Sequence, residues 1–357
     1  MPAASPGASD QLPAQFFSEL EEAFDLAQTQ EGIQRVSLRI GRRPLTLEFA
    51  GPSLVDLIVP ALRHRRVSAP GPGAFTVKVF DSTSTSVTVP PPPWGPNDYL
   101  AQGEISGFNT DRFRTAFRVD AGCLSMIDLE RRVAVFWIRD PAAFPRWMEA
   151  APLRTLLGWW AAGQGLQMAH GAAVGTGDAG LLITARGGSG KSTSALRCLR
   201  DGLLYAGDDY VVVDPIARRV HSVYCTAKAD DAAIDGFFPD LRASSHGRIV
   251  GDGSNKHVFF LDELYPEQIS DLPLTALAVP ALTGADTSGF AMSGAADALR
   301  ALAPTTLFQL AGTGTNDFRL MAELVKTLPV YRLEVSANDG IAATVRRLLE
   351  TAAGVPA

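Results

Sequence analysis

The feature that most constrains this chain is the glycine-rich segment ARGGSGKST at residues 185–193. It follows a continuous apolar run, GLLITA at 180–185, and leads into residues 193–202, which have the pattern of a helix. This context and the closing GKS at 190–192 match the relaxed form of the phosphate-binding loop (P-loop), with Ala185 where the strict pattern has glycine. The alternative is a glycine-rich turn before an ordinary helix. The sequence therefore predicts a P-loop between a buried strand and a helix.

Each part of this loop has an expected role. Glycines can adopt backbone angles that aim successive N–H groups at phosphate oxygens, and the helix N-terminus adds a partial positive charge. Lys191 is expected to reach the β- and γ-phosphates of a nucleotide, and the Ser192 hydroxyl to ligate Mg²⁺. The predicted nucleotide-binding residues are Gly187, Gly188, Ser189, Gly190, Lys191, Ser192 and Thr193.

Two further segments carry polar side chains where a P-loop fold places its reactive groups. AHG at 169–171 precedes a short apolar run, and Asp208 and Asp209 follow the apolar run LLYAG at 203–207. An acid at the end of a strand beside the P-loop strand is suited to ligate Mg²⁺ or to act as a general base. Taken alone, His170 is more often a structural histidine and an aspartate pair a turn.

Composition excludes several protein classes. Hydrophobic residues make up 46% of the 357 residues, which excludes a disordered or fibrous chain. The net charge of −6 argues against nucleic acid as a partner. The three cysteines lack a metal-site spacing and indicate reduced thiols. Neither a signal peptide nor an apolar run of about 18 residues is visible, so the sequence predicts a cytoplasmic protein without membrane contact.

The two halves of the chain differ in their pattern of apolar and polar residues. Residues 1–14 are small and polar and predict a flexible tail. Residues 15–150 contain alternating runs such as 36–40, 45–49 and 75–80, which predict a mainly antiparallel β domain without evident chemistry that is suited to binding an acceptor. Within it, Pro90–Pro93 predict a stiff surface connection anchored by Trp94.

The second half alternates strand-like and helix-like runs. Residues 151–350 therefore predict an α/β or α+β domain that carries the P-loop, and residues 351–357 a short tail.

Three segments together, AHGAAV, GLLITARGGSGKST and LLYAGDDYVVV, resemble the catalytic domain of the bacterial HPr kinase/phosphorylase. They are more similar still to the HPr-kinase-like proteins encoded beside lasso-peptide and other peptide natural-product genes. The 21 positions from His170 to Lys191 and the 18 from Lys191 to Asp209 match the family's pattern, and the resemblance covers about residues 165–335. It implies a P-loop kinase domain that uses ATP and Mg²⁺ to phosphorylate a hydroxyl, that of a serine, on a peptide or small protein. A homo-oligomer is compatible with it.

The resemblance also implies residue roles. Lys191 would hold the phosphates, Ser192 would ligate Mg²⁺, Asp209 would act as base, and His170 would support that acid. Asp208, the residue before the base, is expected to be an acid on the Mg²⁺ side or a structural one. Lys228 and Lys256 are candidates for a second positive charge on the transferring phosphate, although each is more often a surface lysine.

The chain departs from the family pattern in three ways. Thr193 stands where the HPr enzyme has glutamate, and the region of its second acidic metal ligand offers Asp230, Asp231 and Asp235 without a matching motif. No counterpart of the segments tied to the phosphorylase activity is evident. The expectation is therefore a kinase.

Three alternatives stay open at this point. VFFLDE at 258–263 looks like a Walker B strand ending in Asp262 and Glu263, which would fit a P-loop ATPase, although no LSGGQ-like signature precedes it. A small-molecule kinase on the same fold is the second alternative. The third is a nucleotide-sensing scaffold whose N-terminal half binds a partner.

Overall fold

The computed structural model describes residues 8–185, 188–250, 255–309, 311–312, 315–338 and 340–354. The chain is divided into two compact units. Unit 1 comprises residues 1–60, 65–163 and 310–312, and unit 2 comprises residues 61–64, 164–309 and 313–357. This division differs from the expected boundary after residue 150, because helix α5 (Arg154–Gly163) belongs to unit 1 and the segment 61–64 to unit 2. In the described ranges, no helix is long and apolar enough to cross a membrane.

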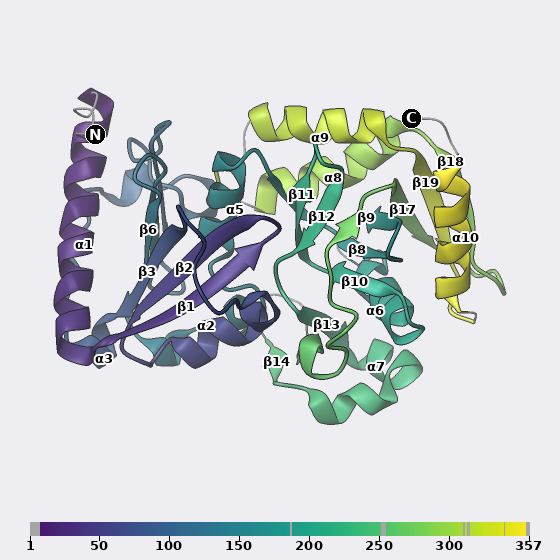
Figure 1. Ribbon diagram of the computed structural model, residues 1–357, viewed down its shortest axis with the longest axis horizontal. Coiled ribbons are helices and arrows are strands. Elements are labelled where there is room, and N and C mark those ends of the chain that lie inside the picture. Colours follow the sequence, from purple (N-terminus) through teal and green to yellow (C-terminus); the bar gives the residue numbers. More distant parts are fainter. Residues whose placement is uncertain are drawn as a thin grey trace. The chain divides into compact units, whose positions relative to one another are not determined.

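Unit 1 is built on one six-stranded sheet of order β1-β2-β3-β6-β5-β4 (Figure 1). Three of its five pairings are antiparallel, whereas β2–β3 and β3–β6 are parallel. Parallel neighbours require crossover connections, and α2 lies in the one between β2 and β3. The sheet is therefore mixed. Its strands are β1 (Ile33–Ile40), β2 (Arg43–Ala50), β3 (Phe75–Asp81), β4 (Phe113–Arg118), β5 (Cys123–Asp128) and β6 (Val133–Ile138), and the other helices of the unit are α2 (Val55–Leu62), α3 (Ser82–Thr85) and α4 (Arg146–Ala150).

Helix α1 (Gln11–Glu31) includes the last residues of the expected tail at 1–14, of which residues 1–7 lie outside the described residues. A 3₁₀ turn at Ala8–Asp10 leads directly into it. Pro13 is tolerated because it lies in the first turn, where backbone N–H groups have no intrahelical acceptor. The helix is held by burial of its apolar face, including Phe17 and Phe24, in the core of unit 1. The predicted anchor Trp94 packs edge to face on Phe16 of the same helix, with ring centroids 5.1 Å apart.

Unit 2 has a central six-stranded sheet of order β10-β8-β9-β17-β19-β18 (Figure 1). Strands β9, β17 and β19 are parallel, and the outer pairings are antiparallel. Alternate residues of β9 enter two different cores: Leu181 packs with α6 and α10, and Leu182 with α8 and α9. Helices therefore cover both faces of the sheet, which explains the uninterrupted apolar sequence of β9. The elements are β8 (Ala172–Gly175), β9 (Gly180–Ile183), β10 (Leu204–Gly207), β17 (Ala276–Leu282), β18 (Gly289–Ser293), β19 (Val330–Val335), α6 (Lys191–Arg200), α8 (Ala295–Gln309), α9 (Thr315–Thr327) and α10 (Ile341–Ala353).

Two smaller sheets complete unit 2, with orders β16-β12-β11-β7 and β13-β15-β14. Both are antiparallel. Helix α10 reaches Ala353, so the first residues of the expected C-terminal tail at 351–357 are helical. The remaining elements are β7 (Gln167–His170), β11 (Tyr210–Asp214), β12 (Arg219–Ser222), β13 (Thr226–Asp230), β14 (Arg248–Ile249), β15 (Lys256–Phe260), β16 (Leu272–Pro273) and α7 (Asp231–Phe237).

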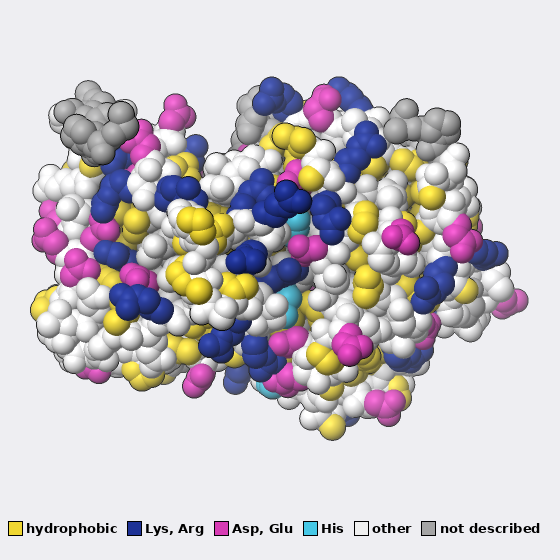
Figure 2. Space-filling model, viewed as in Figure 1, with side chains coloured by type: hydrophobic (Ala, Val, Ile, Leu, Met, Phe, Trp, Pro, Cys, Tyr) yellow, Lys and Arg dark blue, Asp and Glu magenta, His cyan; other side chains and the backbone are white. Residues whose placement is uncertain are grey.

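The face of unit 2 that Figure 2 shows is mixed in charge. On the face shown in Figure 2, acidic and basic side chains are interspersed over the region of α6, α7 and α10. Unit 2 as a whole is a mixed α/β structure with several sheets.

Candidate active site

The segment predicted to be a P-loop lies between strand β9 and helix α6, the context that the sequence predicts. Gly190 is the residue before the helix and has a φ of 85°, in the left-handed region that favours glycine. A Cβ atom there would also lie 3.0 Å from Cδ2 of Leu282. Gly188 has a φ of 77°, and Gly187 lies outside the described residues. Ser189 precedes this turn, and Ser192 and Thr193 occupy the first turn of α6.

Lys191 is the first residue of α6 and is buried, with 6% of its surface exposed. Its Nζ atom donates a hydrogen bond to the carbonyl oxygen of Ala185, at 2.6 Å, so the lysine spans the loop from one end to the other. Burial lowers the pKa of Lys191, and the charges of Asp209 and Asp208 oppose that effect. The ammonium group therefore lies close enough to both carboxylates for their charges to act on it.

Asp208 and Asp209 form the corner between β10 and β11, where the chain passes from the central sheet to the β16-β12-β11-β7 sheet. Gly207 permits this corner, because a Cβ atom there would lie 2.8 Å from Cγ1 of Val211. Strand β7 pairs with β11 so that His170 lies opposite Tyr210. That register brings the Nε2 atom of His170 to 3.2 Å from Oδ1 of Asp209.

Lys228 is the second partner of Asp209. It lies on β13, and its Nζ atom is 2.5 Å from Oδ2 of Asp209. The two oxygens of Asp209 are thus engaged by an imidazole and an ammonium group. Burial alone would raise the pKa of Asp209, but the Lys228 charge and the His170 hydrogen bond hold it well below its usual range. Burial alone would lower the pKa of Lys228, but the charge of Asp209, the hydrogen bond to Asp209 and the charge of Asp208 together raise it.

The surroundings of Asp208 shift its pKa in the opposite direction to that of Asp209. It is 3% exposed, and burial together with the neighbouring charge of Asp209 raises its pKa to about 6. Its carboxylate accepts a hydrogen bond from the side chain of Ser192 and one from the backbone N–H of Lys228, at 3.3 Å. Asp208 is therefore tied to the loop, whereas Asp209 is tied to His170 and Lys228.

The pair Ser192 and Asp208 fits a Mg²⁺ ion that is held mainly by a nucleotide. Within the described ranges, no group of three or more His, Cys, Asp or Glu residues is arranged to hold a metal. Mg²⁺ usually keeps several waters and binds through one or two protein groups together with substrate phosphates. A hydroxyl and a carboxylate joined by a hydrogen bond provide that small donor set.

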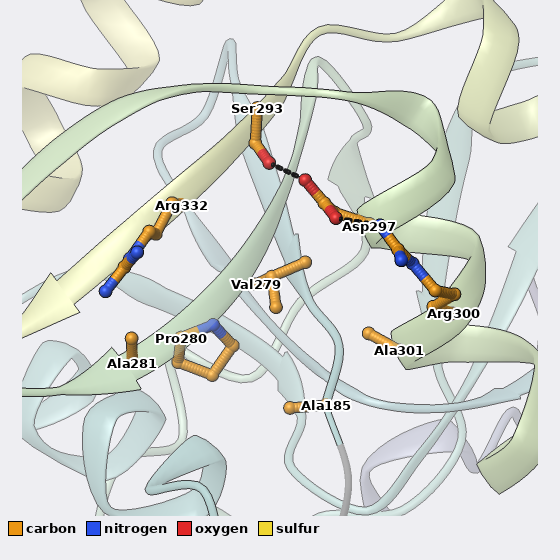
Figure 3. Close-up of a pocket in the computed structure, with 9 residues that line it drawn as sticks. All are labelled: Ala185, Val279, Pro280, Ala281, Ser293, Asp297, Arg300, Ala301 and Arg332. Atoms are coloured by element: carbon orange, nitrogen blue, oxygen red, sulfur yellow. Dashed lines mark hydrogen bonds and ion pairs between the residues drawn. The ribbon is translucent and has the colours of Figure 1, made fainter.

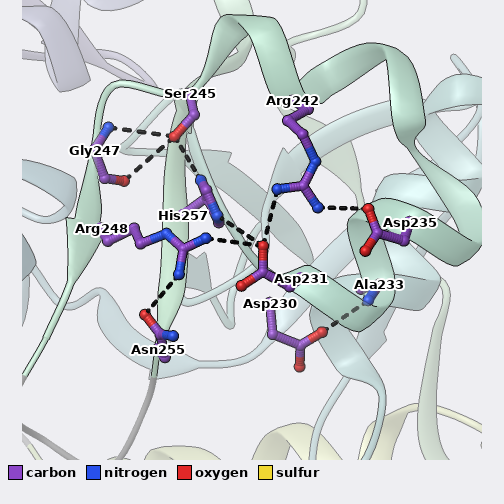
Figure 4. A network of polar contacts seen from close by, with 10 residues as sticks. All are labelled: Asp230, Asp231, Ala233, Asp235, Arg242, Ser245, Gly247, Arg248, Asn255 and His257. Carbon is purple, nitrogen blue, oxygen red and sulfur yellow. Dashed lines mark hydrogen bonds and ion pairs between the residues drawn. The ribbon is translucent and has the colours of Figure 1, made fainter.

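Three other acids that the sequence offered as metal ligands are engaged elsewhere. Asp231 accepts hydrogen bonds from Arg242 at 2.9 Å, Arg248 at 3.0 Å and His257 at 3.2 Å (Figure 4). Asp235 also pairs with Arg242, and Asp230 accepts from the backbone of Ala233 at the start of α7. These contacts account for the three carboxylates as a local network around α7.

The Walker B alternative is not supported. A Walker B strand lies in the same sheet as the P-loop strand, but VFFLDE contributes β15 to a separate antiparallel sheet, and the neighbours of β9 are β8 and β17. Asp262 instead accepts two hydrogen bonds from Arg63, both at 2.8 Å, and Glu263 accepts one at 2.9 Å. These acids form an ion pair with Arg63.

Some contacts of the site have no signal in the sequence. The backbone N–H of His170 donates to the hydroxyl of Thr306 at 3.2 Å, and the ring of Tyr210 lies 5.4 Å from the imidazole. Lys256, the other candidate lysine, lies near enough for its charge to lower the pKa of Lys191. Tertiary packing alone brings Thr306 to the site, whereas Lys256 is one of the two lysines that the sequence offers.

Comparisons with known proteins find one kind of similarity. No family model matches the chain, and no curated protein matches it. Among solved structures, the chain is similar to the Hpr(Ser) kinase/phosphatase from Coxiella burnetii, at 12% sequence identity and a TM-score of 0.28. That similarity covers 53% of this chain and 99% of the other.

Proposed function

We propose that this chain is an ATP- and Mg²⁺-dependent kinase that transfers the γ-phosphoryl group to the hydroxyl of a serine in a peptide or small protein. The observation that carries the proposal is that Asp209 is an ionised carboxylate next to Asp208 in the corner between β10 and β11. Asp208 in turn accepts a hydrogen bond from Ser192 of the predicted P-loop. A nucleotide whose phosphates lie at Lys191 would present its γ-phosphate to this corner. The choice of serine as acceptor rests on the resemblance of three sequence segments to HPr-kinase-like proteins.

Phosphoryl transfer depends mainly on positioning and on neutralisation of charge. Lys191 would bind the β- and γ-phosphates with its ammonium group, and backbone N–H groups at the start of α6 would bind further phosphate oxygens. The bond between the acceptor oxygen and the γ-phosphorus forms as the bond to the β–γ bridging oxygen breaks, and ADP leaves. A bound Mg²⁺ ion, near Ser192 and Asp208, would neutralise charge on the phosphates.

Asp209 would accept the proton of the acceptor hydroxyl. Its low pKa keeps it ionised at neutral pH, so its role is to orient the hydroxyl and take the proton late in the reaction. His170 and Lys228 would hold the carboxylate in place through contacts at 3.2 and 2.5 Å. They are positioning residues for Asp209.

An arrayed library of serine-containing peptides, incubated with the protein, Mg²⁺ and γ-labelled ATP, tests this function. We expect label on serine peptides and none on matched peptides with alanine in place of serine. Asp209→Asn should remove the label, whereas Asp235→Asn, an exposed acid on α7, should retain it. Conversion of ATP to ADP without labelled peptide, at equal rates in both variants, would contradict the kinase and favour an ATPase.

A further inference from the structure

A cavity of about 450 Å³ in unit 2 has no part in the chemistry described above. Its floor is formed by Val279, Pro280 and Ala281 of β17, and Ala185 closes one side (Figure 3). Arg332 of β19, Ser293 at the end of β18 and the first half of α8 complete the lining. The volume lies within the range of roughly 300–1,000 Å³ that is usual for small-molecule sites.

The lining suits a heterocyclic ring. The aliphatic floor can pack against a flat ring, and the Arg332 guanidinium, with 59% of the side chain exposed, can stack on it. Asp297 lies on the opposite side, where it accepts hydrogen bonds from Ser293 at 2.6 Å and Arg300 at 2.5 Å (Figure 3). A carboxylate at this position disfavours a free anion, and it has lone pairs for an amino group of a base.

The cavity adjoins the P-loop at two points. Ala185 lines the cavity and also accepts the hydrogen bond of Lys191 through its carbonyl oxygen. Leu282, which follows the floor residues on β17, lies against Gly190 at the other end of the loop. The Leu282 side chain is apolar and 64% exposed, so an uncovered apolar surface joins the loop to the cavity.

The strand order gives a bound nucleotide its direction. In the central sheet, β8 and β10 lie on one side of the P-loop strand β9, and β17 lies on the other. Asp209 follows β10, so a triphosphate that directs its γ-phosphate to Asp209 directs its other end toward β17. Sheets of this kind bind their ligands outside the carboxyl ends of the parallel strands, where Ala281 and Leu282 lie.

We propose that this cavity binds the nucleoside end of the nucleotide, with the base on the floor of β17 beside Arg332. The inference rests on the proposed function, because it takes the phosphates to be bound at Lys191. It adds that a large part of the affinity for ATP comes from the nucleoside and that β17 and β19 provide it.

Calorimetric titration with Mg²⁺·ATP and with Mg²⁺·tripolyphosphate separates the affinity for the nucleoside from the affinity for the phosphates. We expect the wild type to bind ATP at least about tenfold more tightly than tripolyphosphate, because only ATP has a nucleoside. Ala281→Phe fills the cavity from a half-buried strand position and should bring this ratio near 1 without changing the affinity for tripolyphosphate. Ala343→Phe, at an exposed position of α10, is the matched control and should keep the wild-type ratio.

Arg332→Ala provides a second variant that leaves the sheet intact. It should weaken ATP binding by about 3- to 10-fold and leave tripolyphosphate binding unchanged, because only the stacking contact is lost. Arg347→Ala, exposed on α10, should change neither affinity. Equal wild-type affinities for the two ligands, or an unchanged ratio in Ala281→Phe, would overturn the cavity proposal alone. Failure of the wild type to bind either ligand would overturn the kinase proposal itself.

Discussion

The carboxyl groups of Asp208 and Asp209 are adjacent in the sequence, and their pKa values are displaced in opposite directions. Burial raises the pKa of Asp208 to about 6, whereas Lys228 and His170 hold that of Asp209 well below its usual range against the effect of burial. Two neighbouring acids with separated pKa values can perform two different roles in one site. In the proposed kinase, the one on the loop side assists the metal and the other takes the proton.

The first prediction concerns Asp209. Asp209→Asn keeps the size of the side chain but removes the charge and the proton acceptor, so the rate of transfer should fall by about 10²–10⁴-fold. The affinity for Mg²⁺·ATP, measured by calorimetry, should change little, because Lys191 holds the phosphates. Asp235→Asn is the matched control and should keep the wild-type rate. If Asp209→Asn keeps full transfer while Glu263→Gln abolishes it, the assignment of the base is wrong.

Asp208 should make stability depend on pH in the absence of nucleotide and metal. Its pKa rises from an ordinary value of 3.8 to about 6 on folding, so the folded state binds more protons between these pH values. The contribution of Asp208 to the free energy of unfolding should therefore fall as pH rises from about 4 through 6, by about 3 kcal/mol in total, and not change further well above pH 6.

The variant Asp208→Asn tests this slope. It cannot ionise, so urea unfolding should show it to be more stable than the wild type at pH 8 and about equal at pH 4. Other carboxylates titrate in both proteins and cancel in the difference. A difference that is the same at both pH values would contradict the raised pKa.

Lys191→Met should weaken nucleotide binding. Methionine keeps the aliphatic stem but removes the ammonium group, and hydrogen bonds to charged groups contribute about 1.5–3 kcal/mol. We expect the affinity for Mg²⁺·ATP to fall by roughly 10- to 100-fold, with loss of the rise in melting temperature that ATP causes. Lys326→Met, exposed on α9, is the control and should behave as wild type.

Arg63 should stabilise unit 2 although it precedes the bulk of that unit in the sequence. Asp262 is only 10% exposed, and Arg63→Ala leaves its carboxylate without the two hydrogen bonds that it accepts. We expect the free energy of unfolding to fall by about 1–2 kcal/mol. Urea unfolding measures the change. Arg35→Ala, whose pair with Glu48 is more exposed, should change it by less than about 0.5 kcal/mol.

A fragment that begins near residue 150 extends this test. The segment 61–64 is missing from it, and with it the carbonyl oxygen of Ala61 that accepts the N–H of Cys225 at 2.9 Å. The fragment should therefore melt at a lower temperature than the full chain even when ATP is present. A fragment as stable as the full chain would show that the segment contributes nothing to unit 2.

Local features of the structure could be predicted from the sequence because their signals are local. The apolar run before Ala185, the glycines and the helix pattern together predict β9, the loop and α6. The sequence also places His170, Lys191 and Asp209 through a resemblance in spacing, and the pairing of β7 with β11 brings His170 and Asp209 together.

Other features depend on contacts between distant residues. The alternation of polar and apolar residues in β2 and β3 indicates strands, but it is the same in parallel and antiparallel sheets, so it could not indicate their parallel pairing. Asp262 ends an apolar run and therefore resembles a metal ligand in the sequence. Its actual partner, Arg63, is 199 residues away and could not be identified from the sequence around Asp262. The sequence offers Lys228 as a candidate for a positive charge on the transferring phosphate, but only the folded chain shows that its ammonium group contacts Asp209.

The interleaved path of the chain through unit 2 has a consequence for biosynthesis. Arg63 leaves the ribosome 199 residues before Asp262, which at roughly 5–20 residues per second is an interval of roughly 10–40 s. Strand β19, between β17 and β18 in the central sheet, emerges later still. A nascent chain released before Val330 therefore carries the phosphate-binding loop in a sheet that lacks an interior strand.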